Sequence, residues 1–400
     1  MSIYEEFGIE PIINASGAVT RLGGAPMPPA VLDAFCAAAQ ECVPLDQLQG
    51  IASRIIADVT GAEAGIVTGG AAAALTLGTA AILARDDLRR IERLPNCDFP
   101  CEFVVAREQR NGYDHAVRAA GAKLIEVGFH EPVAGSGVRR CEAWEIEAAI
   151  GPETAGIFYV HSTDSRPALP DVVEVARRHD LPVLVDAAGE LPPRENLRSI
   201  LACGADLVAF SGGKAIRGPQ ASGILCGRRD LVGSAALQML DLDDHFELWD
   251  PPDNLIDKRR LKGLPRHGIG RAMKVSKEGI VALLTALRKF VAGHHDGDRT
   301  AMRERLERIA KNLIDLPVRC RLMVPEDRQS TPQLEIEIDE AKLSRSAFEV
   351  CQRLRRGSPP VYVGHWKLDE GVLVVHPLHL DDNRTEMLSG RLRSELSERT

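Results

Sequence analysis

The alternation of apolar strand-like segments with helical segments constrains the fold of this chain more than any other feature. Stretches with the spacing of amphipathic helices separate the successive apolar segments. Because strands that alternate with helices form a parallel sheet with crossover helices on both faces, the sequence predicts an α/β fold. The predicted strands are residues 64–68, 103–106, 123–127, 155–160 and 183–185, followed by 207–211 and 223–225.

The pattern changes near residue 270. A second domain is expected there because 400 residues exceed what one hydrophobic core usually supports. Two long amphipathic helices precede residues 333–339, whose apolar residues alternate with period two, as in a half-buried antiparallel strand. The predicted organisation is an irregular N-terminal arm (residues 1–30), a large domain (31–270) and a smaller α+β domain (271–400).

Composition narrows the class of protein. The chain is 44% apolar and 26% charged, as in an ordinary globular protein, and its net charge of −8 argues against a nucleic-acid partner. Its first residues are acidic and no apolar segment approaches membrane-spanning length, so neither a signal peptide nor a membrane partner is expected. The nine scattered cysteines indicate reduced thiols and a cytoplasmic location. No metal site is expected, because residues 294–298, His-His-Asp-Gly-Asp, are interpreted as a solvated loop.

Two residues that follow predicted strands carry reactive side chains. An apolar strand runs into Ser211-Gly-Gly-Lys214, then into a loop rich in Gly and Pro and a second strand. The amine of a lysine that lies among small residues at a strand end can be partly desolvated, which favours formation of a Schiff base. A solvated lysine in a loop is the common alternative. Asp186 ends the strand before it, so one crossover would place both side chains at neighbouring strand ends; a carboxylate that caps a turn is the alternative.

Gly69, Gly70 and Ala71 follow the first predicted strand and begin an alanine-rich helix. Free N–H groups at such a helix start bind phosphate, although a tightly packed turn is the alternative. Ser211 is available as a second phosphate ligand. A lysine for a Schiff base, an aspartate for a pyridinium nitrogen and a phosphate site together predict pyridoxal 5'-phosphate as the cofactor.

Planar side chains follow the strand 103–106 at the same predicted edge. His115, Tyr113 or Arg110 is expected to cover the cofactor ring. The alternative is that these side chains only surround the N-terminus of a helix. His161 follows the strand 155–160 and is expected to reach the cofactor or the substrate.

Residues 186–191 and 211–223 closely resemble the selenocysteine synthase (L-seryl-tRNA selenium transferase) superfamily of fold-type-I pyridoxal-phosphate enzymes, and Ile12-Ile-Asn-Ala-Ser-Gly is similar to its usual opening. The resemblance extends from about residue 8 to residue 380, and it looks closest to the D-glucosaminate-6-phosphate ammonia-lyase branch. It implies an aspartate aminotransferase-like fold with a large and a small domain, and at least a homodimer. The tRNA-gripping N-terminal domain of true selenocysteine synthases has no counterpart here, so a small amino acid rather than tRNA is the expected substrate.

The resemblance also assigns roles to individual residues. Lys214 would be the Schiff-base lysine, Asp186 the pyridinium partner, and Arg271 a ligand of the phosphate in a neighbouring subunit. Relatives often place an arginine near the substrate carboxylate in a segment that corresponds to residues 359–367, which contains none. Either His365 or Lys367 is expected to replace it, or the carboxylate binds elsewhere, with Arg21 as an N-terminal option. The residues implied around the phosphate are Gly69, Gly70, Ala71 and Ser211.

The expected reaction is α,β-elimination from a small β-hydroxy amino acid, including sugar-derived ones such as D-glucosaminate 6-phosphate, to a 2-oxo acid and ammonia. Lys214 would remove the Cα proton, and His161, His115 or Lys214 itself would protonate the leaving hydroxyl. Aldol cleavage, β-replacement, racemisation and transamination stay open, because the same cofactor serves them all. A non-catalytic protein that binds a partner or tRNA is the alternative of another class, and the lack of G-x-G-x-x-G after the first strand argues against a nicotinamide dehydrogenase.

Overall fold

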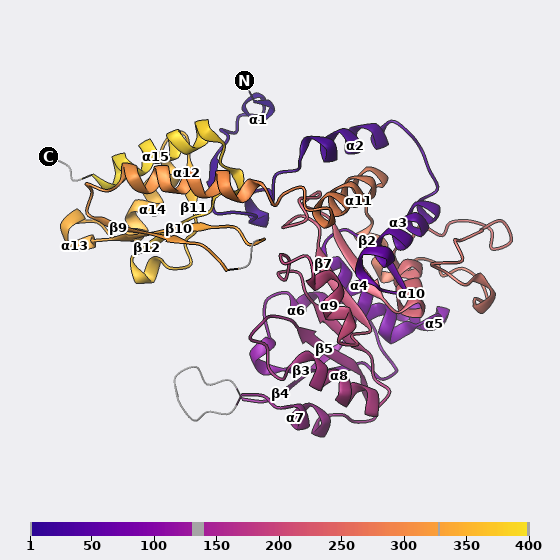
Figure 1. Cartoon of the computed structure of the whole chain (residues 1–400). Helices are drawn as coiled ribbons and strands as arrows, with labels where there is room; N and C mark the ends of the chain where they lie inside the picture. Colours follow the sequence, from indigo (N-terminus) through magenta and orange to yellow (C-terminus); the bar gives the residue numbers. More distant parts are fainter. Residues whose placement is uncertain (1, 130–139, 327–328, 398–400) are drawn as a thin grey trace. The chain divides into compact units, whose positions relative to one another are not determined.

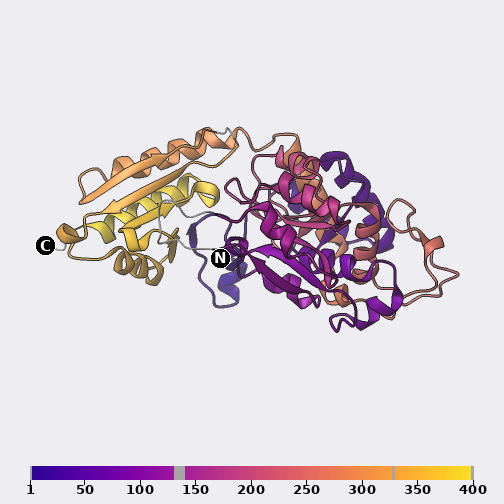
Figure 2. The same ribbon diagram turned by 90° about the horizontal axis from the view of Figure 1, so that it is seen from below.

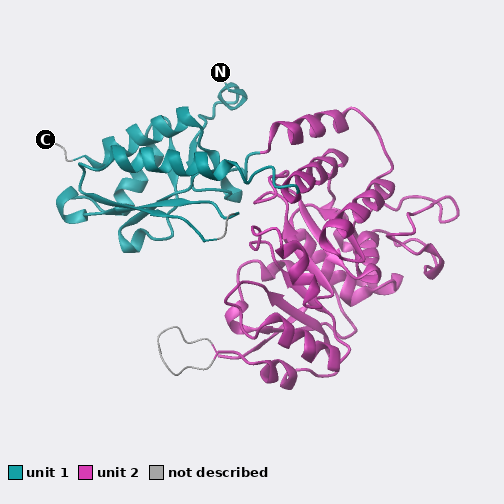
Figure 3. Ribbon diagram, viewed as in Figure 1, with its two compact units in different colours: residues 1–26, 292–400 teal, residues 27–291 magenta. Residues whose placement is uncertain are grey.

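The computed structural model of the chain describes residues 2–129, 140–326 and 329–397 (Figure 1). The chain divides into two compact units. Unit 1 comprises Met1–Pro26 and Ala292–Thr400, and unit 2 comprises Met27–Val291 (Figure 3). Each unit buries its own apolar residues, as expected for a chain of this length. Among the described residues, no helix combines the length and the apolar composition that crossing a membrane would need.

Unit 2 is built on a seven-stranded sheet with the strand order β2-β8-β7-β6-β5-β3-β4. Only β8 runs against the direction of the other described strands of this sheet, because it pairs antiparallel with both β2 and β7. This mostly parallel sheet confirms the α/β fold. The strands are β2 (Ala64–Thr68), β3 (Glu102–Ala106), β4 (Lys123–Val127), β5 (Thr154–Val160), β6 (Val183–Asp186), β7 (Leu207–Ser211) and β8 (Gly223–Gly227).

Helices cover both faces of this sheet, because successive side chains of a strand point to opposite faces. In β6, Val183 and Val185 belong to one buried apolar cluster and Leu184 belongs to the other. The first cluster includes residues of α2 (Pro29–Ala39), α3 (Leu45–Thr60), α7 (Ala143–Ala148), α8 (Leu169–Arg178), α9 (Asn196–Ala202) and α11 (Lys277–Val291). The second includes residues of α4 (Ala71–Ala84), α5 (Leu88–Arg93), α6 (Asp114–Ala119) and α10 (Arg229–Met239).

Unit 1 contains two small sheets and a group of helices that share one core (Figure 2). An antiparallel sheet has the order β12-β10-β9, and β1 pairs in parallel with β11. In β10, Leu334 and Ile336 are buried while Glu337 is exposed, which confirms the alternation predicted for this strand. The elements are α1 (Ile3–Glu6), β1 (Ile13–Ala15), α12 (Asp298–Asn312), β9 (Val318–Met323), β10 (Gln333–Ile338), α13 (Glu340–Leu343), α14 (Ala347–Arg356), β11 (Val361–Val363), β12 (Val372–Val375) and α15 (Asp382–Leu396).

The division between the units falls at residues 291 and 292, later than the predicted change near residue 270. The reason is that α11 packs on α2 and α3 and contributes Leu283 and Leu287 to the core of unit 2. The N-terminal residues were expected to form an irregular arm, yet β1 within them pairs with β11 of the same unit. A three-residue strand is too short to produce a periodic signal.

Candidate active site

Several predicted cofactor residues of unit 2 meet at one edge of its sheet. β5, β6 and β7 are parallel neighbours, and their register pairs Asp186 with Val160 on one side and with Ala209 on the other. The backbone N–H of His161 donates to the Asp186 carbonyl oxygen at 2.9 Å. Asp186, His161 and the segment that begins at Ser211 therefore lie at the carboxyl ends of three adjacent strands, where α/β proteins bind ligands.

Asp186 is a buried carboxylate whose negative charge is only partly compensated. It is 6% exposed, and its Oδ1 accepts the backbone N–H of Ala188 at 3.0 Å. Burial raises the pKa of Asp186, while the Ala188 hydrogen bond and the positive charge of Lys214 act in the opposite direction. A cationic hydrogen-bond donor would stabilise such a carboxylate. The protonated ring nitrogen of pyridoxal phosphate is a donor of that kind, so Asp186 fits the cofactor.

Lys214 is held in a tight turn directly after β7. The Gly212 N–H donates to the Ser222 carbonyl oxygen at 2.9 Å, which ties the two sides of the turn together. A Cβ at Gly213 would lie 2.6 Å from the Cα of Gln220, so the backbone packs too closely there for a side chain. Lys214 itself is half-buried, and its positive charge lowers the pKa of the nearby aspartate. The turn therefore holds an amine close to the buried carboxylate.

The start of α4 is preceded by a glycine. Gly70 has a φ of +137°, and among the described residues no side-chain hydrogen bond caps this helix start. Residues 71–73 are at least partly exposed, whereas the helix is buried from Ala74 onward. A Cβ at Gly223 of β8 would lie 2.5 Å from the carbonyl carbon of Gly70, and Gly223 pairs in register with Ser211. Free amides, a helix dipole and a hydroxyl therefore gather in one place and fit a phosphate group.

A cavity of about 320 Å³ lies against the first turn of α4. His115 and Tyr113 line it together with the first residues of that helix. The Arg110 guanidinium donates instead to the Asp114 carboxylate at 2.5 Å. Of the three side chains considered for covering the cofactor ring, His115 and Tyr113 therefore face the helix start.

His161 adds a buried nitrogen to the same edge of the sheet. Its Nδ1 is buried and has no hydrogen-bond partner among the described residues. Burial lowers the pKa of His161, so its imidazole is neutral near pH 7. Because a buried polar atom without a partner is costly, a polar atom of the cofactor or the substrate would stabilise this arrangement.

Glu190 belongs to this edge as well, and the sequence interpretation gave it no role. It follows Asp186 by four residues, in the turn after β6, and is half-buried. Burial, and then the negative charge of Asp186, raise the pKa of Glu190, while the positive charge of Lys214 lowers it. The signal was present, because the motif over residues 185–193 contains Glu190, but only its aspartate was given a function.

Arg271 lies in the short helix Ile269–Met273, which packs against Gly69. A Cβ at Gly69 would lie 3.1 Å from the Met273 carbonyl oxygen, so this glycine allows a close approach of the two segments. The Arg271 guanidinium forms an ion pair with Asp241. Its role at the phosphate of a neighbouring subunit stays a prediction.

Asp241 also belongs to a group of three potential metal ligands. Its carboxylate, that of Asp243 and the imidazole of His267 offer donor atoms within 4.8 Å of one another. All three residues are exposed, and the Arg271 guanidinium already neutralises Asp241. A metal ion bound here would have to compete with that arginine.

A second group of charged residues lies within unit 1. The guanidinium carbons of Arg21 and Arg355 lie 5.6 and 5.2 Å from the centroid of the Tyr362 ring. Burial and then these two positive charges lower the pKa of His365. The Nε of Arg355 is buried and, in the part of the chain that the structure describes, has no hydrogen-bond partner. Two arginines beside one aromatic ring fit an anionic group.

Arg355 was not among the predicted substrate-binding residues, because it lies on α14, before the segment 359–367 in which an arginine was expected. Lys367, which was among them, donates to the Glu335 carboxylate at 2.6 Å. Its charge is therefore compensated, whereas those of Arg21 and Arg355 gather around an uncharged ring.

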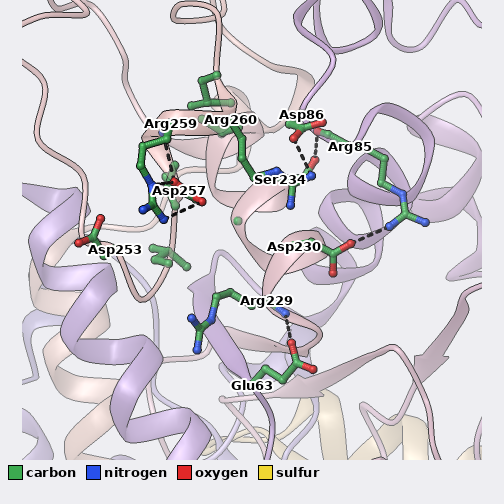
Figure 4. A pocket seen from close by; sticks show the side chains of 15 residues that line it. Glu63, Arg85, Asp86, Arg229, Asp230, Ser234, Asp253, Asp257, Arg259 and Arg260 are labelled. Atoms are coloured by element: carbon green, nitrogen blue, oxygen red, sulfur yellow. Dashed lines mark hydrogen bonds and ion pairs between the residues drawn. The ribbon is translucent and has the colours of Figure 1, made fainter.

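A larger cavity, of about 640 Å³, lies at the opposite edge of the sheet of unit 2 (Figure 4). Its lining includes Glu63, which precedes β2, and Arg229, which follows the antiparallel β8, so it opens at the amino ends of the parallel strands. Charged side chains here compensate one another, as the Arg85–Asp230 ion pair at 2.9 Å illustrates. The larger volume therefore does not mark the active site, because the buried carboxyl group of Asp186, the Lys214 amine and the His161 imidazole lie at the other edge.

Comparison with known proteins places these observations in a family context. The family model described as L-seryl-tRNA selenium transferase matches residues 12–241. A 5'-C-glycyluridine monooxygenase-decarboxylase of Streptomyces sp is 30% identical, over 98% of this chain and 92% of the relative. A D-glucosaminate-6-phosphate ammonia lyase of Salmonella typhimurium (strain 14028s / SGSC 2262) is 28% identical, over 98% of this chain and 97% of the relative.

Solved structures agree with this assignment of the fold. A structure of D-glucosaminate-6-phosphate ammonia-lyase superposes with a TM-score of 0.80 at 27% identity and covers 99% of this chain and 98% of its own. A cysteine desulfurase of Escherichia coli superposes with a TM-score of 0.55 at 15% identity, over 99% and 98% of the two chains, and supports the fold alone.

Proposed function

This chain belongs to the L-seryl-tRNA selenium transferase family and is a pyridoxal-phosphate enzyme, and on that basis we propose that it converts a small β-hydroxy amino acid to a 2-oxo acid and ammonia by α,β-elimination. The observation that carries the proposal is the placement of Lys214, Asp186 and His161 at the carboxyl ends of adjacent strands of one sheet. The relative named as an ammonia lyase, which this chain matches over nearly its whole length, supports the type of reaction.

The residues of unit 2 would have different roles at the cofactor. When bound, pyridoxal phosphate accepts the electron pair that remains when the substrate loses its Cα proton. Lys214 would hold the cofactor covalently in the resting enzyme, and its Nζ would then take that proton. Asp186 would keep a proton on the ring nitrogen, and the start of α4 with Ser211 would hold the phosphate. His115 or Tyr113, which line the cavity at the start of α4, would cover the ring.

The arginines of unit 1 suggest what kind of substrate is recognised. We propose that Arg21 and Arg355, with His365 beside them, bind an anionic group of the substrate, either its carboxylate or a phosphate. A sugar-derived amino acid that carries both groups satisfies this requirement. We also propose a homo-oligomer in which Arg271 reaches the phosphate site of a neighbouring subunit.

A second candidate function has a specific observation in its favour. The relative named as a monooxygenase-decarboxylase is 30% identical over nearly the whole chain. An enzyme of that kind would release CO₂ and consume O₂, whereas the proposed elimination releases ammonia without consuming O₂. The products therefore separate the two functions.

The test is a substrate screen with the cofactor-loaded enzyme. β-Hydroxy amino acids of both configurations, with and without a phosphate group, are assayed for ammonia, 2-oxo acid, CO₂ and O₂ consumption. The proposal predicts equal amounts of ammonia and 2-oxo acid with no amino acceptor present. Lys214→Ala is expected to abolish this activity, while Lys262→Ala, a change at an exposed lysine, leaves it intact. O₂-dependent CO₂ release, or a requirement for a 2-oxo acid acceptor, would overturn the proposal.

A further inference from the structure

The proposed elimination needs a proton donor at the leaving oxygen, because hydroxide is a poor leaving group. Of the residues expected to supply that proton, His161 has a pKa lowered by burial and is neutral near pH 7. Lys214 is already engaged at Cα, and His115 is exposed on α6. A protonated carboxyl group at the same edge of the sheet would be an alternative donor.

Glu190 stands in a fixed turn at that edge. Its backbone N–H donates to the Ala187 carbonyl oxygen at 3.1 Å, and its carbonyl oxygen accepts the Asn196 Nδ2 at 2.7 Å. The turn begins at Asp186, whose Oδ1 accepts the Ala188 N–H at 3.0 Å. Because these bonds tie both ends of the turn, the backbone of Glu190 is held close to the carboxyl end of β6.

The surroundings of Glu190 favour its protonated form. Its side chain is half-buried, and within residues 2–129, 140–326 and 329–397 it forms no ion pair. Asp186 and Lys214 are the charged groups that act on it, and the effects of burial and of Asp186 outweigh that of Lys214. Glu147 shows the opposite case, because its bonds to Arg178 lower its pKa to about 2. Glu190 therefore retains a proton at a higher pH than an exposed glutamate does.

We propose that Glu190 is the general acid of the elimination and protonates the β-oxygen of the substrate. This inference rests on the proposed function. Lys214 Nζ takes the Cα proton, and the electron pair of the former Cα–H bond forms the Cα–Cβ double bond. The Cβ–O bond breaks with its electron pair on oxygen, which takes the proton of Glu190 and leaves as water. Glu190 remains as a carboxylate near the protonated Lys214, which can return the proton.

Leaving-group chemistry tests this role. The cofactor-loaded wild-type enzyme, Glu190→Gln and Glu190→Asp are compared on serine and on β-chloroalanine, each of the configuration that the wild type accepts. Chloride needs no proton to leave, so Glu190→Gln is expected to lose about 100- to 10,000-fold in kcat on serine and little on β-chloroalanine. Glu190→Asp restores part of the loss, and Glu153→Gln, at an exposed position of unit 2, behaves as the wild type. Equal losses of Glu190→Gln on both substrates would overturn the inference.

Two further measurements separate this inference from the proposed function. Exchange of the Cα proton with deuterium from D₂O reports the step at Lys214, so Glu190→Gln is expected to retain exchange and Lys214→Ala to lose it. The ¹³C resonance of the Glu190 carboxyl, assigned by difference from Glu190→Gln in the substrate-free holoenzyme, is expected to titrate above the ordinary glutamate value. A pKa of Glu190 at or below that value would contradict the inference about Glu190 but not the proposed function. A wild-type enzyme that eliminates neither from serine nor from β-chloroalanine would contradict the proposed function.

Discussion

Replacing Gly223 by alanine gives a sharp test of the phosphate site at the start of α4. The new Cβ would lie 2.5 Å from the carbonyl carbon of Gly70 and 2.7 Å from the N of Ala71. These distances fall short of the shortest ordinary contact, 3.4 Å, by about 0.7 to 0.9 Å, so the helix start must move by a comparable amount. Both contacts are with backbone, which cannot turn away as a flexible side chain can.

Such a shift separates the helix N–H groups from a bound phosphate. Each hydrogen bond to a charged group contributes about 1.5–3 kcal/mol, so losing one is expected to weaken cofactor binding by about 10- to 100-fold. The overpacked sheet is expected to lose about 1–3 kcal/mol in the free energy of unfolding as well.

The assay is a titration of the cofactor-free variant with pyridoxal phosphate, followed by absorbance, together with urea unfolding. Gly151→Ala is the matched control, because a Cβ there meets nothing within 4 Å and the backbone φ is not positive. A Gly223→Ala variant that binds pyridoxal phosphate as tightly as Gly151→Ala would refute the placement of the phosphate at this helix start.

The remaining predictions concern charge and assembly. Because the folded-state pKa of Asp186 is raised, the wild type binds more protons when folded than when unfolded and loses stability as pH rises above the ordinary value of 3.8. The cofactor-free Asp186→Asn variant is expected to lack this loss. In urea unfolding, the free energy of unfolding of the variant minus that of the cofactor-free wild type is therefore expected to grow with pH. A difference that stays constant with pH would contradict a raised pKa for Asp186. Arg355→Ala is expected to raise KM by about 10- to 100-fold with an unchanged cofactor spectrum, through loss of a charge-assisted hydrogen bond, while the exposed neighbour Arg356→Ala leaves KM unchanged. If Arg271 acts across a subunit interface, unfolding and refolding an equal mixture of the inactive Arg271→Ala and Lys214→Ala variants is expected to restore activity. Half of the dimers formed are heterodimers with one intact site each, so about a quarter of the wild-type sites are recovered. No recovery of activity in a mixture shown to contain heterodimers would contradict that role.

Much of the large unit could be predicted because its signals are local and repeated. The apolar runs of β3, β5, β6 and β7 and the helices between them lie within a few residues of the predicted segments. The antiparallel direction of β8 carries no such signal, since a buried strand looks the same in either direction. The division between the units was also beyond local patterns, because α11 joins unit 2 through packing on α2 and α3 rather than through its own composition.

The candidate site divides in a similar way. Asp186 ends β6, and Lys214 and Gly70 lie within three residues of the ends of β7 and β2, so the rule that ligands bind at the carboxyl ends of parallel strands was enough to select them as candidates. Glu190 and Arg355 depend on longer-range effects. The function inferred for Glu190 comes from burial next to Asp186, and that of Arg355 from a ring contributed by β11. Neither relation can be read from the spacing of residues along the chain.

Covalent trapping of the cofactor tests the central claim most directly. Borohydride reduction of the holoenzyme, followed by peptide mass spectrometry, identifies the lysine that carries the pyridoxyl group. Modification of Lys214, with loss of the visible absorbance band, is the predicted result, and it should disappear in Lys214→Ala but persist in Lys262→Ala. A pyridoxyl group on another lysine, or a purified protein that neither contains nor binds pyridoxal phosphate, would contradict the assignment of this site.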